Sequence, residues 1–92
     1  MSMERANITV SGRVQGVGFR FFVTQKARDL NISGTVKNEM NGTVSVNAEG
    51  EKDNIEQFIV HLYQGPSMAR VDDIDTQWVE YTGKYQGFRT VG

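Results

Sequence analysis

Short alternating stretches and two longer stretches at helical spacing make up the hydrophobic pattern of this chain. Residues 7–11 alternate between polar and apolar side chains, so Ile8 and Val10 share one face of a predicted strand. Further along, apolar residues recur every three or four positions, which predicts a helix over about 20–30. Asn31 is a suitable end for this helix because asparagine tolerates the left-handed backbone conformation. The apolar stripe comprises Phe19, Phe22, Val23, Ala27 and Leu30.

The next two alternating stretches predict a hairpin. Strands are expected over 32–38 and over 43–48, and Asn41-Gly42 between them is a strong turn signal. A strict two-residue turn at this dipeptide would pair Val36 with Asn47, which would put the valines of the two strands on opposite faces. Since both sets of valines need one buried face, we predict an odd-length loop or a bulge around the turn.

A second helix and two further strands complete the pattern. Asp53 and Glu56 resemble a capping box that opens the helix, and Gly65-Pro66 ends it. A fourth strand is predicted over about 70–81, and a short terminal strand over 88–91. The core stripe of this second helix comprises Ile55, Phe58, Ile59, Leu62 and Tyr63.

The order of predicted elements is β-α-β-β-α-β with a final edge strand. It indicates an α+β sandwich in which two helices cover one face of an antiparallel sheet. The 92 residues suffice for one domain, and we expect that domain to span 1–92. The chain carries no apolar run of membrane-spanning length and no signal-peptide core at its start, so we expect it in the cytoplasm.

Composition excludes several classes of function. The chain contains no cysteine, so disulfides and thiolate metal sites are excluded, and a single histidine, His61, argues against a histidine-based zinc site. The acidic run Asp72, Asp73 and Asp75 lacks the glycine and terminal glutamate of a calcium loop and is interpreted as a charged sheet edge. A net charge of −1 argues against a general nucleic-acid binder.

Candidate chemistry lies in the loop Gly12-Arg13-Val14-Gln15-Gly16-Val17-Gly18-Phe19-Arg20, between the first strand and the first helix. Glycines such as Gly16 and Gly18 let a loop turn its backbone N–H groups toward an anion, and the helix that follows adds the positive end of its dipole. Arg20 supplies a planar fork that can hold two phosphate oxygens. Taken alone, this spacing equally fits a glycine-rich turn beside a solvated arginine. It lacks the features of a nucleotide P-loop or a Rossmann fingerprint.

Topology brings a second polar side chain to the same place. A right-handed β-α-β crossover makes the first two strands parallel, so their C-terminal ends lie at one edge of the sheet. Asn38 ends the second strand two positions after Val36, so their side chains lie on the same face of that strand. Asn38 is therefore expected to point toward the start of the first helix, near Arg20. Asparagine more commonly caps a turn with its own side chain in such a position. The convergence with Arg20 favours a functional role.

Two runs of the sequence resemble the signatures of the acylphosphatase family. They are the loop quoted above and the run Gly34-Thr35-Val36-Lys37-Asn38 through Asn41-Gly42-Thr43-Val44; Gly65-Pro66-Ser67 with Ala69-Arg70-Val71 is similar to a further family segment. The resemblance implies a ferredoxin-like fold and hydrolysis of the carboxyl-phosphate anhydride to a carboxylate and inorganic phosphate. It departs at the end, where Phe88–Gly92 lacks the last tyrosine that the family commonly has. The resemblance assigns phosphate binding to Arg20 and to the backbone amides of Gln15, Gly16, Val17, Gly18 and Phe19, and water orientation to Asn38.

The expected enzyme needs no metal and no cofactor, because an acyl phosphate already carries a good leaving group. We expect a monomer that binds a small acyl phosphate, or inorganic phosphate as its product, and neither nucleic acid nor membrane. Phe21 lies outside its helix's apolar stripe and is expected either at the rim of the site or partly buried, whereas His61 is expected to face solvent. Two rivals share the fold order: an RNA-recognition module, which needs exposed aromatics on its central strands, and a small metabolite-binding regulatory module.

Overall fold

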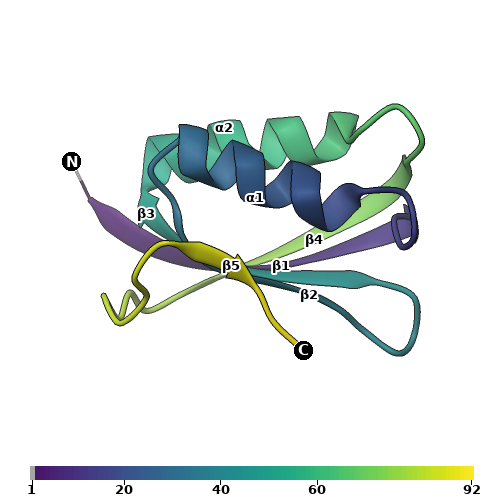
Figure 1. Ribbon diagram of the computed structural model, residues 1–92. Coiled ribbons are helices and arrows are strands. Elements are labelled where there is room, and N and C mark those ends of the chain that lie inside the picture. The colour runs from purple at the N-terminus through teal and green to yellow at the C-terminus, as the bar shows by residue number, and fades with distance from the viewer. Residues whose placement is uncertain (1) are drawn as a thin grey trace.

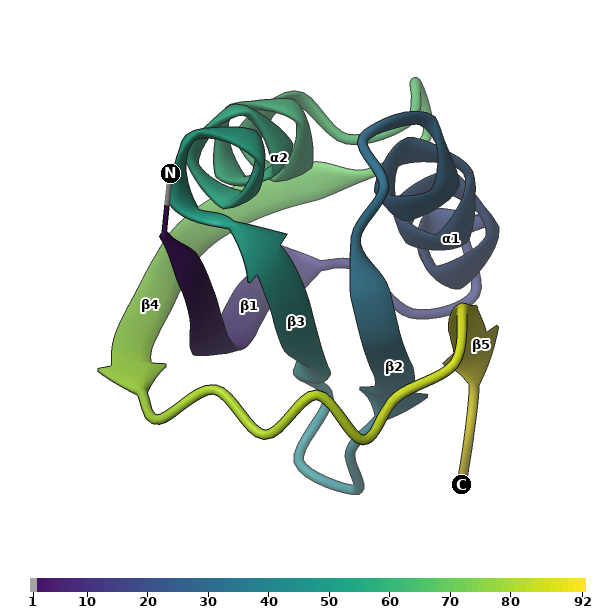
Figure 2. The ribbon, with the colours of Figure 1, turned by 90° about the vertical axis from the view of Figure 1, so that its left-hand side faces the viewer.

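A computed structural model describes residues 2–92, which form a five-stranded sheet with both helices packed on one face (Figures 1 and 2). This is the α+β ferredoxin-like sandwich that the sequence predicts. None of the helices formed within the described residues is both long and apolar enough to cross a membrane. In chain order the elements are β1 (Met3–Arg13), α1 (Phe19–Asp29), β2 (Ser33–Asn38), β3 (Val44–Glu51), α2 (Lys52–Gln64), β4 (Arg70–Val79) and β5 (Phe88–Thr90).

Sheet topology brings the ends of two strands together. The strand order is β4-β1-β3-β2-β5, and every pairing is antiparallel except that of β2 with β5, which is parallel. Because β1 and β2 both run antiparallel to β3, they are parallel to each other. Their C-terminal ends therefore lie at one edge of the sheet, where the loop after β1 and the loop after β2 both project (right-hand end of Figure 1).

The core lies between the sheet and the helices and follows the period-two alternation of the strands. Ile8, Val10, Val36 and Val46 point to the helix face, and each is at most 2% exposed. Burial of a side chain of this size contributes about 1.5–3 kcal/mol relative to leaving it in water. The helices contribute Phe19, Val23, Ala27, Ile55, Phe58 and Leu62 to the same cluster.

The β2–β3 hairpin has the irregular loop predicted from its register. Val36 pairs with Val46 rather than with Asn47, so both sets of valines face the core. The connection runs over residues 39–43, an odd number, and is closed by a hydrogen bond from the Glu39 amide to the Thr43 carbonyl at 2.8 Å. The loop is therefore longer than a two-residue turn because the valines of both strands must share one buried face. The predicted stop of α1 is also confirmed, since Asn31 has φ 56°.

The predicted start of α2 and one of its predicted core residues are wrong. The capping box fails because α2 begins at Lys52, which puts Asp53 inside its first turn. Glu51, in the cap position, makes no side-chain capping bond and still pairs with Met3 in the sheet, so the chain passes from β3 into α2 with no loop between them. The predicted core residue Tyr63 is 52% exposed.

Gly12 belongs to β1 and not to the loop. It sits at a register shift where Asp72 is the extra residue on β4, and its φ is 125°. A Cβ at this position would overlap the Arg70 carbonyl oxygen. Gly12 therefore permits the close approach of two strands at a β-bulge, and the connecting loop itself shortens to residues 14–18.

A segment over residues 80–87 crosses the open face of the sheet between β4 and β5 (Figure 2). It is fastened by Glu49, whose carboxylate accepts hydrogen bonds from the Thr82 amide and hydroxyl, both at 2.8 Å, and from the Gly83 amide at 3.1 Å. Glu49 is only 2% exposed. On the same face, the guanidinium of Arg5 lies 5.8 Å from the centre of the Tyr85 ring.

Candidate active site

The loop after β1 leads directly into the N-terminus of α1. Gly18 is the N-cap residue of the helix, with φ 78° and ψ 17°, and Gly16 has φ 73°. A Cβ at either glycine would meet nothing within 4 Å, so these positions favour glycine for its left-handed backbone and not for lack of space. The first bond of the helix runs from the Phe22 amide to the Gly18 carbonyl at 3.1 Å. The amides before it form a positive helix end, and no acidic side chain lies in that first turn.

A cavity of about 180 Å³ opens beside this helix end, and Asn38 joins it from β2. The structure therefore brings together Arg20 and Asn38, the two side chains singled out from the sequence. Gln15 and Val17, also predicted to contribute backbone amides, lie outside the lining. The cavity is lined by Val14, Gly16, Gly18, Phe19, Arg20, Phe21 and Asn38.

Arg20 is available for an anion. Its side chain lies in the first turn of α1 and is exposed. Among residues 2–92 its guanidinium has neither a hydrogen-bond acceptor nor an ion-pair partner, in contrast to Arg70, which pairs with Asp72 at 3.0 Å. A guanidinium without an internal partner keeps all its donors for a ligand, and its planar fork matches two oxygens of a phosphate.

Asn38 lines the cavity and also carries a buried acceptor. Its side-chain oxygen Oδ1 is buried and has no hydrogen-bond partner among the described residues. The turn-capping role is taken instead by Asn41, whose Oδ1 accepts from the Thr43 amide at 3.1 Å and from the Thr43 hydroxyl at 2.7 Å. A buried polar atom without a partner costs about 1–3 kcal/mol, so this side chain is held at an energetic cost.

Gln15 has a role that sequence reasoning missed. Its side-chain amide donates to the Glu39 carbonyl at 2.8 Å and to the Thr43 carbonyl at 2.9 Å. The glycine loop is thereby tied to the hairpin loop that begins directly after Asn38. No spacing or periodicity marks such a contact, because it joins residues 24 and 28 positions apart.

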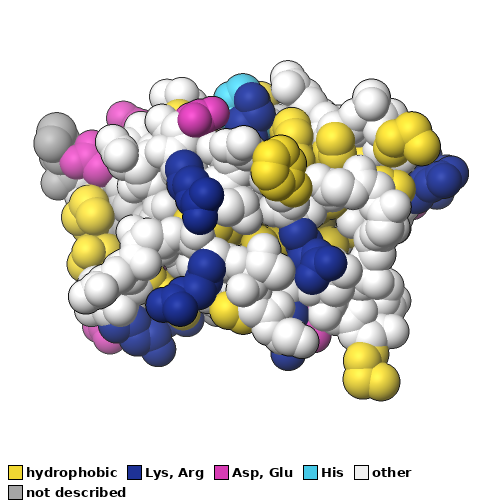
Figure 3. Space-filling view, in the orientation of Figure 1, with side chains coloured by type: hydrophobic (Ala, Val, Ile, Leu, Met, Phe, Trp, Pro, Cys, Tyr) yellow, Lys and Arg dark blue, Asp and Glu magenta, His cyan; other side chains and the backbone are white. Residues whose placement is uncertain are grey.

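The other basic residues near the loop in sequence lie elsewhere in space. Lys26 sits over the Phe22 ring at 5.5 Å, and Arg28 donates to the Phe88 carbonyl at 3.2 Å. Figure 3 shows the lysines and arginines dispersed over this face of the molecule and not gathered in one patch. Of the four basic residues between 12 and 28, only Arg20 lines the cavity.

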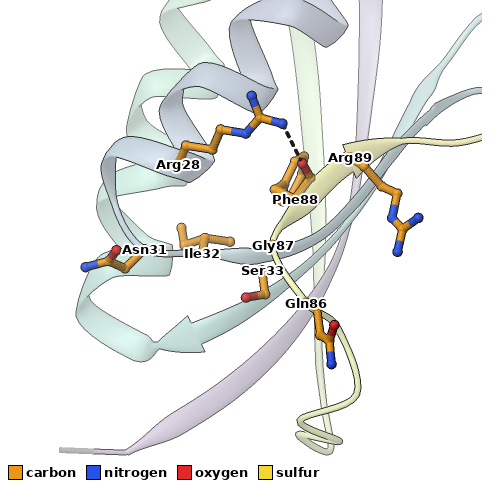
Figure 4. A pocket seen from close by; sticks show the side chains of 8 residues that line it. All are labelled: Arg28, Asn31, Ile32, Ser33, Gln86, Gly87, Phe88 and Arg89. Carbon is orange, nitrogen blue, oxygen red and sulfur yellow. Dashed lines mark hydrogen bonds between the residues drawn. The ribbon is translucent and has the colours of Figure 1, made fainter.

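A second hollow, of about 500 Å³, lies between the end of α1, the start of β2 and β5. It holds two arginines, but their side chains do not converge: Arg28 reaches the Phe88 carbonyl, and Arg89 extends away from it (Figure 4). Neither Asn38 nor the glycine loop contributes to this hollow. It therefore lacks the convergent donors of the smaller cavity.

The other residues considered as candidates from the sequence do not line the cavity. His61 is half-buried on α2, less exposed than expected, and lies outside the cavity lining. Asp72, Asp73 and Asp75 lie exposed on the edge strand β4, as predicted. Within residues 2–92, no three histidine, aspartate or glutamate side chains are grouped as metal ligands.

The open face of the two central strands is polar. Pairing of β1 with β3 puts Asn7 and Thr9 beside Asn47 and Ser45 on the face away from the helices. Aromatic platforms on which RNA bases stack are therefore missing from these four positions. This observation disfavours the RNA-recognition alternative.

Comparisons with known proteins match nearly the whole chain. A family model described as Acylphosphatase matches residues 6–90. An acylphosphatase of Salinibacter ruber is 42% identical over 94% of this chain and 90% of its own length, and one of Thermus thermophilus is 48% identical over 88% and 92%. The crystal structure of acylphosphatase from Bacillus subtilis superposes with a TM-score of 0.94 at 34% identity, covering 97% of this chain and 99% of that one.

Proposed function

The chain belongs to the acylphosphatase family, and on this basis we propose that Arg20, Asn38 and the loop over Gln15–Phe19 form its catalytic site. The reaction is hydrolysis of an acyl phosphate to a carboxylate and inorganic phosphate. The observation that supports the proposal for the site is the single small cavity in which Arg20 and Asn38 meet beside the glycine loop.

The loop and Arg20 bind the phosphoryl group. The loop over Gln15–Phe19, of which Gly16, Gly18 and Phe19 line the cavity, offers backbone amides to its oxygens together with the positive end of α1, and the guanidinium of Arg20 holds two of them. In phosphoryl transfer the transition state is loose and its charge is spread over the three equatorial oxygens. Donors fixed in position before the reaction stabilise that charge without reorganising, so they lower the barrier for the chemical step.

Asn38, whose side chain lines the cavity, orients the attacking water through its amide group. The water oxygen forms a bond to phosphorus, and the bond from phosphorus to the acyl oxygen breaks, so the carboxylate leaves with the electron pair. An amide is not a competent base, and the water's proton therefore passes to an oxygen of the substrate's own phosphate. Positioning and charge stabilisation are sufficient here without a metal ion, because a carboxylate is a good leaving group.

The protein acts as a monomer in the cytoplasm, on a small molecule and not on nucleic acid or membrane. Its net charge of −1 gives no general attraction to polyanions. Inorganic phosphate, as the product, is expected to compete with the substrate for the loop. Size-exclusion chromatography with light scattering checks the oligomeric state.

The decisive assay measures phosphate release from benzoyl and acetyl phosphate in the presence of EDTA. Arg20→Ala is expected to raise KM and to lower kcat/KM by about 10²–10³-fold, since it removes both binding and transition-state stabilisation. Asn38→Ala is expected to lower kcat by a similar factor of about 10²–10³ with little change in KM.

Arg89→Ala and Asn7→Ala are the matched controls, because both residues are exposed and lie outside the cavity. They are expected to keep the wild-type rate. Absence of phosphate release by the wild type would overturn the catalytic assignment as a whole. Full activity of Asn38→Ala would remove only the water-orienting role.

A further inference from the structure

We propose that Phe21 is the contact surface for the acyl group of the substrate and that it favours acyl phosphates with an aromatic or bulky apolar acyl group. The inference rests on the proposed function, because it needs the phosphate to occupy the cavity beside Arg20. It concerns the half of the substrate that neither the glycine loop nor Asn38 holds.

The size of the cavity leaves the acyl group outside. At about 180 Å³ it is smaller than the roughly 300–1,000 Å³ of pockets that enclose a whole small-molecule ligand. In the proposed site the phosphoryl group and the attacking water already occupy this volume beside Arg20 and Asn38. An acyl group bonded to that phosphate must extend over the rim.

Phe21 is the apolar side chain that this rim presents. Of the other apolar side chains in the lining, Val14 and Phe19 are each 1% exposed and belong to the core. The two lining glycines offer only backbone. Phe21, by contrast, is 71% exposed. A phenyl ring left in water beside the anion-binding arginine gains by covering an apolar ligand group.

In-line displacement gives the acyl group its direction. The attacking and leaving oxygens lie on opposite sides of phosphorus, so the acyl group departs away from the water that Asn38 orients. Asn38 comes from β2, whereas Phe21 comes from the first turn of α1. A group leaving away from β2 can therefore meet the phenyl ring on the helix.

Phe21 is not needed for the core. Its neighbour Phe22 supplies the packing contact, with its ring 6.2 Å from that of Phe19, and does not line the cavity. Removing a ring that is 71% exposed takes little buried area from the fold. Phe21→Ala is therefore expected to fold, and circular dichroism checks this.

The test compares kcat/KM for benzoyl phosphate and acetyl phosphate in the wild type, Phe21→Ala and Phe21→Tyr. Contact between two aromatic rings contributes about 0.5–1.5 kcal/mol, which corresponds to about a 2- to 12-fold change in kcat/KM. Phe21→Ala should lower kcat/KM for benzoyl phosphate by this factor, chiefly through KM, and leave acetyl phosphate almost unchanged. Phe21→Tyr should keep the wild-type ratio between the two substrates.

Tyr63→Ala is the matched control, since Tyr63 is a half-exposed aromatic on α2 outside the cavity. It should leave the ratio unchanged. If Phe21→Ala leaves the ratio of kcat/KM for benzoyl and acetyl phosphate unchanged, including by an equal loss for both substrates, the role of Phe21 is overturned. The proposed function still stands in that case, as long as the wild type hydrolyses these substrates. A wild type that hydrolyses neither compound would overturn both.

Discussion

The side chain of Gln15 holds the backbone of Glu39, the residue that directly follows Asn38, through a hydrogen bond of 2.8 Å. A second bond of 2.9 Å from the same amide reaches the Thr43 carbonyl at the other end of the hairpin loop. The glycine loop and the strand end that carries Asn38 belong to different elements. Gln15 ties them together, so under the proposed mechanism the distance from phosphorus to the attacking water depends on this side chain.

Gln15→Met, which keeps the length of the side chain but removes its donors, is expected to lower kcat about 10- to 100-fold, since a displacement of about 1 Å at a reacting centre can cost 10²-fold. The backbone amides of the glycine loop and Arg20 remain in place. The inhibition constant of inorganic phosphate should therefore change much less than kcat. Steady-state kinetics with phosphate as competitive inhibitor measure both quantities.

A double-mutant cycle tests whether Gln15 acts through Asn38. If Asn38 orients the attacking water as proposed, Asn38→Ala already removes that orientation, so adding Gln15→Met should cause little further loss of kcat. Losses that multiply in the double variant would contradict this coupling. They would show instead that Gln15 supports the fold independently of Asn38.

Much of the fold follows from local patterns in the sequence. Alternation at Ile8 and Val10, and at Val36 and Val46, shows which strand faces are buried, and the same need for a common face predicts the odd-length hairpin loop. The meeting of Arg20 with Asn38 follows from topology, because parallel strands end at one edge of a sheet.

The features that escaped prediction depend on residues distant in sequence. The Gln15 side chain binds carbonyls 24 and 28 positions away, and Glu49 is fastened to a segment more than 30 positions away. Gly12 belongs to the loop by composition, yet its partner across the bulge on β4 decides its role. Asp53 failed as a cap because α2 begins at Lys52, directly after the last residue of β3, which local spacing does not show.

Glu49 makes stability depend on acid pH. Burial by itself raises the pKa of this carboxyl group, but the hydrogen bonds from Thr82 and Gly83 and the charge of Arg5 outweigh burial, so the net pKa is lowered. A carboxyl group with a lowered folded-state pKa stabilises the fold above its unfolded pKa of about 4.3 and loses that contribution as the pH falls through the folded value.

Glu49→Gln is accordingly expected to reduce the free energy of unfolding at neutral pH by about 1–3 kcal/mol. The reason is that a neutral amide replaces the charged carboxylate that accepts the hydrogen bonds from Thr82 and Gly83 in a buried site. The variant should also lose less stability than the wild type as the pH falls below the unfolded-state pKa of about 4.3 toward the lowered folded-state pKa of Glu49. Urea denaturation across this range measures both effects. With Glu80→Gln, an exposed carboxylate on the same crossing segment, the neutral-pH stability should stay near that of the wild type; an equal loss would argue against the special role of Glu49.

The pH dependence of catalysis tests the absence of an enzyme base. If the water's proton passes to the substrate phosphate, the pH profile of kcat/KM should follow the ionisation of the substrate and should shift when benzoyl phosphate is replaced by another acyl phosphate. The lone His61 lies outside the cavity, so His61→Ala should leave the profile unchanged. An inflection near neutrality that is common to all substrates would contradict direct proton transfer to the phosphate.

Gly34 provides a test of how closely β2 and β3 must approach. Its φ is 146°, and a Cβ there would overlap the Asn47 carbonyl oxygen across the strand pair. Gly34→Ala must therefore separate the strands that carry the hairpin and Asn38, and a cost of about 2–5 kcal/mol is expected from backbone strain and overpacking together. Gly42→Ala is the matched control: its φ is 93°, but a Cβ there meets nothing within 4 Å, so only the strain of about 1–2 kcal/mol applies. Chemical denaturation of both variants measures the difference, and equal losses would show that close approach contributes nothing at Gly34.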